Sequence, residues 1–244
     1  MSRLLVSVKN LEEANLALNN HVDIIDLKSP INGALGALAI EDIAEIVAYI
    51  KQQDSSRLIT ATVGDLPMQP NLLLPAVTNV ADTGVDIVKI GFFNVTDEPI
   101  KVYEVCIEAL QSLIRADIKL VAVLFAEYQY PDELIAMLKN AGFFGVMLDT
   151  AHKNGATLFD CLSHQQIRGF VENARKLGLQ TGLAGSLRHE QISLVKQFEA
   201  DYVGLRGGVC ADSLRTNQLC LDKLERVTKL FRNCCNFATA ELEA

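Results

Sequence analysis

Three lysines stand within or directly after apolar, strand-like runs, which are unusual places for an ammonium group: Lys28, Lys89 and Lys153. Burial of an unpaired charge is costly, so a buried lysine tends toward its neutral form. Aspartates accompany two of the lysines, since Asp26 lies two residues before Lys28 and Asp149 lies four residues before Lys153. A cluster of amines with lowered pKa is what imine formation with a carbonyl substrate requires. The pattern therefore favours Schiff-base catalysis.

A structural role is the alternative for each of these lysines taken singly. A lysine at a strand end often extends its ammonium group to solvent or pairs with a nearby carboxylate. This alternative weakens if all three strand ends open onto the same place. The elements that position the lysines decide between the two interpretations.

Eight apolar runs recur along the chain and are predicted to be strands: Arg3–Val8, Asp23–Lys28, Arg57–Val63, Val85–Ile90, Ile118–Leu124, Phe144–Asp149, Leu179–Leu183 and Tyr202–Arg206. Most are continuously apolar, which is typical of strands buried on both faces. Segments with helical periodicity alternate with them: Leu11–Asn19, Ile40–Gln53, Leu72–Thr83, Ile100–Asp117, Asp132–Ala141, Gln165–Leu177, Ser186–Phe198 and Asp222–Asn233.

Eight strand-then-helix units in 244 residues predict an α/β protein with a single (β/α)8 barrel, the TIM-barrel fold. No linker rich in Pro, Gly or Ser interrupts the sequence, so we expect residues 1–244 to form one domain, with a mobile tail from about residue 236. An open doubly wound sheet would need a glycine-rich turn after its first strand, and residues 7–11 contain none. In a barrel the carboxyl ends of all strands meet at one mouth, so this fold would gather the three lysines and the two aspartates.

A second group of candidate residues follows the last two predicted strands: Gly185, Ser186, Arg206, Gly207 and Gly208. Phosphates often bind at this position of the barrel, on backbone N–H groups and a helix N-terminus. Ser186 is expected to cap the next helix or to donate a hydrogen bond, and Arg206 to add a charged fork. The alternative is that the glycines serve turns and that Arg206 pairs with a carboxylate on the rim.

Other polar residues near strand ends are weaker candidates. Asp65 is predicted to be a turn aspartate, Glu127 and Tyr128 to line the site, and His152 to be a solvated loop residue. The remaining histidines show no metal-ligand spacing. We therefore expect neither a metal nor a cofactor.

Composition narrows the classes of partner. The net charge is −8 with no basic run, so nucleic acid is not an expected partner. No stretch approaches the roughly 20 apolar residues that cross a bilayer, and the N-terminus lacks a targeting pattern. The six cysteines form no Cys-x-x-Cys pair, which favours free thiols in a reducing cytoplasm. The expected protein is cytoplasmic and binds no membrane.

Several of these segments form a recognisable series in the order of the chain: Asp23–Pro30 with Gly33–Ala37, Thr60–Asp65, Asp86–Gly91, Met147–Asp160, Gly182–Leu187 and Gly204–Gly207. The most specific is Leu-Asp-Thr-Ala-x-Lys-x-Gly-x-Thr-Leu-Phe-Asp at residues 148–160. From about residue 3 to residue 210 the series resembles the (5-formylfuran-3-yl)methyl phosphate synthase family. Two regions depart from the family pattern: residues 126–131, which are shorter, and the tail beyond Cys210.

The resemblance implies a TIM-barrel lyase that condenses two molecules of glyceraldehyde 3-phosphate into a furan aldehyde phosphate, with release of phosphate and water. Such a reaction belongs to methanofuran biosynthesis and C1 metabolism. The family's Schiff-base lysine matches Lys28 and its proton-accepting lysine matches Lys89, while Asp26, Asp149 and Lys153 complete the matched set. The implied partner is a triose phosphate, and a homo-oligomer is expected.

Two other functions remain open from the residues alone. A class I aldolase or a sugar-phosphate isomerase would use the same fold and the same phosphate site. A non-catalytic barrel that binds a phosphosugar would need the phosphate site but no amines of lowered pKa. The three lysines therefore count against a purely binding role.

Overall fold

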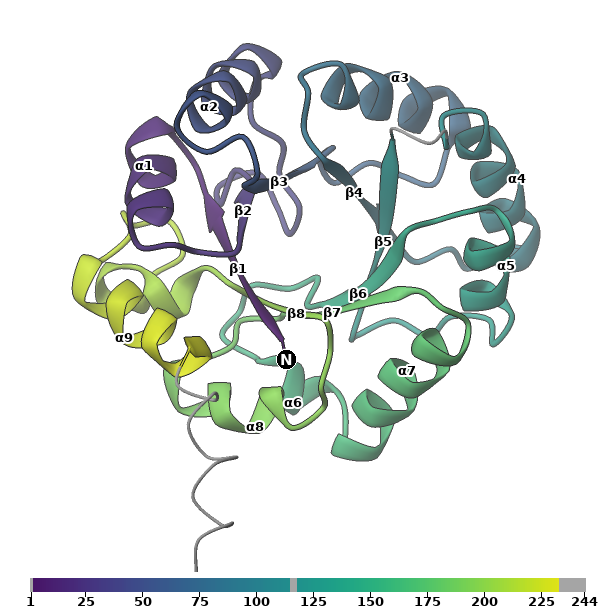
Figure 1. Ribbon diagram of the computed structural model, residues 1–244. Helices are drawn as coiled ribbons and strands as arrows, with labels where there is room; N and C mark the ends of the chain where they lie inside the picture. The colour runs from purple at the N-terminus through teal and green to yellow at the C-terminus, as the bar shows by residue number, and fades with distance from the viewer. Residues whose placement is uncertain (1, 115–117, 233–244) are drawn as a thin grey trace, which may run out of the picture.

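The computed structural model describes residues 2–114 and 118–232, and within them a closed barrel of eight parallel strands. Figure 1 looks into the barrel, with the helices outside the ring of strands. Each strand pairs with the next in the sequence, and β8 pairs with β1 to close the ring. The strands are β1 Arg3–Val8, β2 Ile24–Leu27, β3 Leu58–Thr62, β4 Ile87–Phe92, β5 Lys119–Phe125, β6 Gly145–Asp149, β7 Gln180–Leu183 and β8 Tyr202–Leu205. The predicted TIM-barrel fold is confirmed.

The helices follow the strands around the barrel, and each lies between two strands in the sequence except the last. They are α1 Leu11–Asn19, α2 Ile40–Gln53, α3 Pro70–Ala81, α4 Pro99–Gln111, α5 Leu134–Asn140, α6 Leu158–Cys161, α7 His164–Lys176, α8 Ile192–Lys196 and α9 Leu221–Arg232. Short 3₁₀ helices occur at η1 His189–Gln191, η2 Gly207–Val209 and η3 Ala211–Ser213. No helix among the described residues is long and apolar enough to cross a membrane. The tail from residue 236 lies outside the described residues.

Two apolar layers hold the barrel together. The larger layer fills the space between the strands and the surrounding helices. The smaller layer lies inside the barrel, where Leu5, Val121, Met147 and Tyr202 pack together. Continuous apolar runs supply both layers at once, because successive side chains of a strand point to opposite faces.

Some helices and strands begin or end at other residues than predicted, and at two of these boundaries the conformation or hydrogen bond of a single residue accounts for the difference. The predicted helix from Ser186 begins only at His189, because Ser186 has a left-handed φ of 48° that no helix accepts. Strand β4 begins and ends two residues later than predicted, since the carboxylate of Asp86 accepts a hydrogen bond from the backbone N–H of Ile59 at 2.7 Å, just before the strand starts. Helix α4 ends at Gln111, before the predicted end at residue 117, which lies outside the described residues.

Candidate active site

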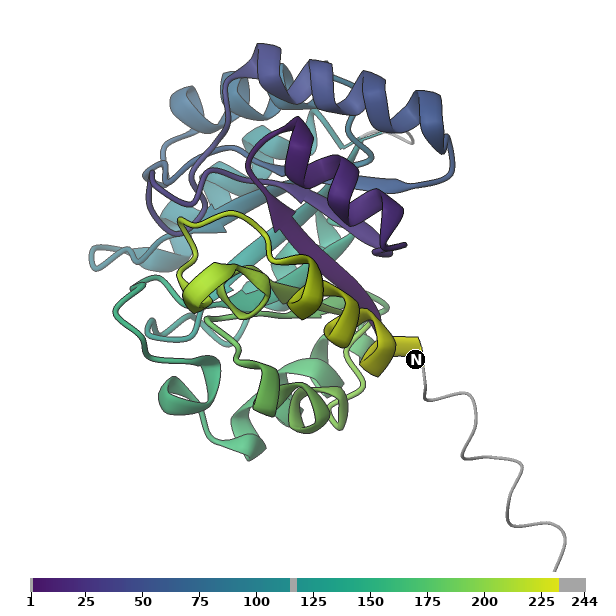
Figure 2. The same ribbon diagram turned by 90° about the vertical axis from the view of Figure 1, so that its left-hand side faces the viewer.

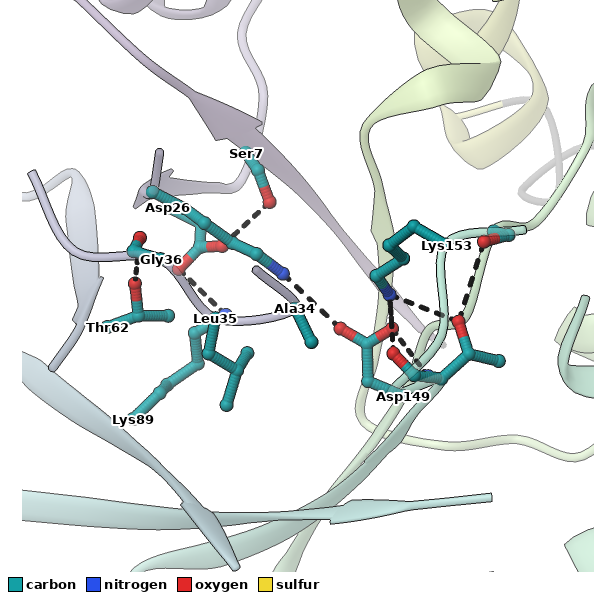
Figure 3. A network of polar contacts seen from close by, with 12 residues as sticks. Ser7, Asp26, Ala34, Leu35, Gly36, Thr62, Lys89, Asp149 and Lys153 are labelled. Carbon is teal, nitrogen blue, oxygen red and sulfur yellow. Dashed lines mark hydrogen bonds and ion pairs between the residues drawn. The ribbon is translucent and has the colours of Figure 1, made fainter. Parts of the chain in front are cut away.

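A buried ion pair between Asp26 and Lys89 lies inside the barrel. Asp26 is on β2 and fully buried, and one of its carboxylate oxygens lies 2.8 Å from Lys89 Nζ on β4. The same carboxylate accepts hydrogen bonds from Ser7 Oγ at 2.7 Å and from Thr60 Oγ1 at 2.6 Å. Figure 3 shows this network beside the second aspartate of the site, Asp149. Four neighbouring strands therefore contribute to one polar cluster.

Lys89 differs from prediction in position. The sequence places it at a strand end, but it is the third residue of the six in β4 and is 2% exposed. Its side chain points into the barrel interior, where desolvation acts on it more strongly than at the mouth. Its partner, Asp26, lies on β2 across the intervening strand β3, and not near it in the sequence.

Burial lowers the pKa of Lys89, and this effect outweighs the opposing charge of Asp26. The positive charge of Lys28 lowers the pKa of Lys89 further. For Asp26, burial raises the pKa, but the charges of Lys89 and Lys28 prevail and hold it below its ordinary value. The arrangement therefore combines an ionised carboxylate with an amine that gives up its proton more easily than a solvated lysine.

A second cluster stands at the carboxyl end of β6, where Asp149 lies between two lysines. Lys153 Nζ is 2.8 Å from Asp149 Oδ1 and donates to Thr150 O at 2.7 Å and Thr150 Oγ1 at 3.0 Å. Lys28 Nζ, just beyond β2, lies 3.4 Å from Asp149 Oδ2. Lys28 is therefore the most loosely held of the three amines.

The protonation states in this second cluster follow from burial and charge. Burial raises the pKa of Asp149, but the charges of Lys153 and Lys28 outweigh it and hold that pKa well below its usual range. Burial lowers the pKa of Lys153 against the opposing effect of Asp149. Asp149 therefore stays ionised at neutral pH and fixes the positions of both amines.

One cavity of about 690 Å³ connects the lysines with the segments after β7 and β8. Lys28, Lys89 and Lys153 line one part of it. The other part is lined by the predicted phosphate-binding segments, which include Gly185, Ser186, Gly207 and Gly208. The structure thus brings both groups of predicted site residues to the same mouth of the barrel.

The phosphate-binding segments differ from prediction in how they could bind an anion. Ser186 caps no helix, because η1 begins three residues later, and its hydroxyl lies 3.4 Å from Thr150 Oγ1. Within the described residues, no protein acceptor takes the backbone N–H groups of Gly185, Ser186, Gly207 and Gly208. These segments offer backbone N–H groups, and not a long helix N-terminus, to an anion in the cavity.

Arg206 does not have the role that the sequence predicts for it. Its guanidinium binds the carboxylate of Glu13 and donates to Ser7 O at 3.0 Å, Arg215 O at 2.8 Å and Asn217 O at 2.8 Å. A guanidinium has five N–H groups, and all of them are used in these hydrogen bonds. The partner carboxylate, on α1, is 2% exposed and so is buried, not exposed on the rim as the alternative expected. Arg206 therefore ties β8 to β1 and α1 and has no N–H group left for a phosphate.

Other cationic residues, which the sequence analysis did not single out, line the cavity. Arg188, Arg215, Lys223 and Arg226 also line it, and none of these four has a carboxylate within ion-pair distance among the described residues. Arg188 and Arg215 lie in loops without a strand or helix period, and Lys223 and Arg226 lie on α9, whose packing against the barrel mouth the sequence pattern does not give. The cavity is basic although the whole protein is acidic.

Two acidic residues near the mouth hold loops in place. Glu127 accepts hydrogen bonds from the backbone N–H groups of Ala151 and His152 at 2.8 and 2.9 Å, and so anchors the loop after β6. Asp65 accepts hydrogen bonds from Ala34 and Leu35 in the loop after β2. Asp65 is thus more than the local turn residue that the sequence predicted.

Fold and site together define a TIM barrel with a basic, lysine-centred cavity at the carboxyl ends of its strands, where TIM-barrel enzymes have their active sites. A family model described as 4-HFC-P synthase matches residues 4–228. A (5-formylfuran-3-yl)methyl phosphate synthase from Methanococcus aeolicus is 35% identical over 240 residues, covering 95% of this chain and 99% of the relative. Another from Methanopyrus kandleri is 38% identical, covering 85% of this chain and 89% of the relative. The chain belongs to the (5-formylfuran-3-yl)methyl phosphate synthase family and is an enzyme.

Solved structures agree on the architecture. Phosphoribosyl anthranilate isomerase from Thermus thermophilus superimposes with a TM-score of 0.63, covering 94% of this chain and 98% of the isomerase. The two sequences are 16% identical, so this likeness concerns the fold alone.

Proposed function

We propose that the enzyme condenses two molecules of glyceraldehyde 3-phosphate into (5-formylfuran-3-yl)methyl phosphate. The atoms balance when one phosphate and two molecules of water leave. Elimination of phosphate makes the enzyme a carbon–oxygen lyase, and we assign its product to the biosynthesis of methanofuran-type cofactors and to C1 metabolism. One observation carries the proposal: a loosely held amine, Lys28, shares a cavity with a buried amine of lowered pKa, Lys89.

Lys28 is the amine we assign to the imine. Its only ion-pair partner among the described residues is Asp149 at 3.4 Å, so its nitrogen can leave this contact at small cost. Attack on the substrate aldehyde and loss of water give an iminium ion, which withdraws electrons from the adjacent C–H bond. Asp149, held ionised by the two lysines beside it, stabilises the iminium charge.

Lys89 is the base we assign to the next step. Its neutral form takes the proton from the carbon beside the iminium, and Asp26 stabilises the ammonium ion that results. The enamine carbon then forms the bond to the second triose. Phosphate elimination, ring closure and loss of two molecules of water complete the furan, and hydrolysis of the imine returns the free amine of Lys28. Lys153, 2.8 Å from Asp149, is assigned to hold a phosphate or to assist proton transfer.

Phosphate groups are assigned to the other end of the cavity. The backbone N–H groups of Gly185, Ser186, Gly207 and Gly208, which have no acceptor in the part of the chain that the structure describes, suit the oxygens of a phosphate. Arg188, Lys223 and Arg226 stand around them and supply the positive charge that Arg206 does not. An acidic protein would otherwise repel a dianionic substrate.

The test combines product analysis with trapping. Purified enzyme is incubated with glyceraldehyde 3-phosphate, and mass spectrometry identifies the small-molecule product; a parallel sample receives borohydride and is digested to locate the adduct. We expect the furan aldehyde phosphate as product and one triose adduct on the peptide that contains Lys28. Lys28→Ala should lose both, whereas Lys51→Ala, which removes a lysine paired with Asp86 at the opposite end of the barrel, should lose neither.

Product identity separates this reaction from its rivals, since an aldolase or an isomerase would give an aldol or a ketose phosphate. An active enzyme that traps only on Lys153, or never traps, would contradict the assignment of Lys28.

A further inference from the structure

The loop between β2 and α2 folds back into the barrel mouth and fills part of it. Ala34 and Leu35, at 2% and 1% exposure, belong to the apolar cluster inside the barrel, although they come from a loop outside it. Figure 3 shows Ala34 and Leu35 in the same part of the site as Lys89, Asp26 and Asp149. This segment, residues 34–35, is called the plug below.

The plug lies over the part of β4 that carries the buried lysine. Gly91, two residues after Lys89, faces the same side of the strand, and a Cβ at Gly91 would stand 2.9 Å from Leu35 Cδ1. A side chain at position 91 would therefore displace both Leu35 and Phe93, whose Cε2 would stand 2.6 Å from the Cβ. Glycine there leaves room for Leu35 on the inner face of β4, two residues along the strand from Lys89.

The carboxylate of Asp65, in the loop after β3, holds the plug through the backbone N–H groups of the plug residues. One carboxylate oxygen accepts the N–H of Ala34 at 2.7 Å and the other accepts the N–H of Leu35 at 2.6 Å. Position 33 must be glycine for this grip, because its φ is 94° and a Cβ would collide with the Asp65 carboxylate. On the other side of the loop, Arg215 donates to Gly33 O at 3.0 Å.

We propose that Asp65 is a positioning residue that holds Leu35 as an apolar plug next to Lys89, so that Lys89 (2% exposed) meets less water than Lys28 (7% exposed) although both line the same cavity. The proposal deepens the proposed function, because it explains how one cavity keeps two amines in different surroundings. It rests on that function only in making Lys89 the base. The exclusion of water from Lys89 can be measured without turnover.

The plug affects proton transfer because it limits the hydration of the Lys89 amine. Burial is the largest cause of the lowered pKa of Lys89, and the charged groups that act on it are Asp26 and Lys28 from β2 and its end and Asp149 from β6. Asp65 itself makes no ion pair with Lys89. Loosening the plug would admit water and raise the pKa of Lys89, because hydration favours the ammonium form.

The first experiment uses Asp65→Asn, which keeps the shape of the side chain but leaves one of the two N–H groups facing an amide NH₂. The control is Asp201→Asn, because Asp201 accepts the N–H and hydroxyl of Thr181 in a similar way at the opposite end of the barrel. Hydrogen exchange of the peptide containing residues 34–35 measures the grip. Competitive acetylation of Lys89 across a pH series, read by mass spectrometry, measures its pKa.

We expect Asp65→Asn to speed exchange of the plug amides at least about tenfold and to raise the labelling midpoint of Lys89 by at least about half a pH unit. The control should change neither. Leu35→Ala, which trims the plug and keeps the grip of Asp65, should raise the midpoint with little change in exchange. This second variant gives the answer if Asp65→Asn fails to fold.

An unchanged midpoint in both folded variants would overturn the proposal. A raised midpoint of Lys89 labelling supports it. The pH profile of turnover is a separate test of the proposed function. If the labelling midpoint rises while the acid limb of turnover stays where it was, the plug acts as proposed and Lys89 is not the base.

Discussion

Lys89 and Lys28 carry the same functional group but lie in different surroundings, and this difference defines their chemistry. Both line the cavity, but Lys89 is bonded to Asp26 at 2.8 Å inside the ring of strands, whereas the one ion pair of Lys28 within residues 2–114 and 118–232 is with Asp149 at 3.4 Å. Position, and not residue type, separates the base from the electrophile-capturing amine in the proposed mechanism. Both assignments can be tested by single substitutions.

Lys89→Arg keeps the positive charge but removes the ability to become neutral near pH 7. We expect turnover to fall by a factor of about 10² or more, in line with the loss of a general base, while borohydride still fixes a triose on Lys28. Turnover and trapping are measured on the same preparation. Turnover like that of the unmodified enzyme would show that Lys89 holds the site together electrostatically and takes no proton.

The pH dependence of kcat/KM follows from the neighbours of Lys89. Its pKa is lowered from the ordinary 10.5 by burial, and the charge of Asp26 opposes that shift. A base must be neutral, so activity falls as pH drops below the pKa of Lys89. Asp26→Asn removes the opposing charge, so the pKa falls further and the acid limb should move to lower pH, at a reduced maximum rate.

The matched control for this profile is Asp23→Asn, since Asp23 accepts the N–H of Leu4 at the opposite end of the barrel. This substitution should leave the acid limb of kcat/KM at the same pH. A shift of the Asp26→Asn limb to higher pH would refute the sign of this coupling.

At the scale of elements, two glycines allow the effect of side-chain packing in a strand to be compared with the effect of helix propensity. In β7, a Cβ at Gly182 would enter the ring of Tyr202, so Gly182→Ala should destabilise the fold by about 1–3 kcal/mol. In α7, Gly169 is exposed and has open space around it, so Gly169→Ala should stabilise the fold by about 0.5–1 kcal/mol. Urea denaturation of both variants measures the two free energies of unfolding. Equal effects of the same sign would contradict the packing argument.

Arg206 belongs to this scale as well, because it joins three elements. Arg206→Leu leaves the Glu13 carboxylate buried without its partner, and breaking a buried pair costs about 3–5 kcal/mol. We therefore expect a lower urea midpoint as the first effect, with any change in KM following from a displaced β8. A raised KM with unchanged stability would return Arg206 to the role of phosphate ligand that the sequence suggested.

The strands and the general position of the site were predictable because their signals are local. Continuous apolar runs indicate buried strands, and the fold rule then brings their carboxyl ends together. The pairing of Asp26 with Lys89 was not predictable, since it depends on the stagger between β2 and β4. The structural role of Arg206 was not predictable either, because its guanidinium binds Glu13, which lies 193 residues away in the sequence. Loop geometry at Ser186 rests on a backbone angle that no residue pattern encodes.

At the scale of the whole molecule, charge is distributed unevenly, with a net charge of −8 and a cavity lined by cations such as Arg188, Arg215 and Lys223. Raising the ionic strength from 0.01 M to 0.15 M shortens the screening length from about 30 Å to about 8 Å. We expect KM for glyceraldehyde 3-phosphate to rise over this range while kcat changes little, as measured in steady-state assays. A KM that does not depend on salt would mean that the cavity cations make no contribution to binding.

The seam between β1 and β8 has a consequence for the order of events during synthesis. Arg206 donates to Ser7 O and Glu13, and the N–H of Arg3 bonds Asp201 O, so β1 completes its hydrogen bonds only when β8 is present. Figure 2 shows β1 at this side of the barrel, beside the C-terminal helix α9. A nascent chain that has emerged only through β7 exposes one edge of β1 and the apolar interior behind it. Such edges pair readily with other chains. During translation the enzyme therefore passes through a long interval in which its N-terminal strand needs protection, and this interval ends only when Arg206 has left the ribosome.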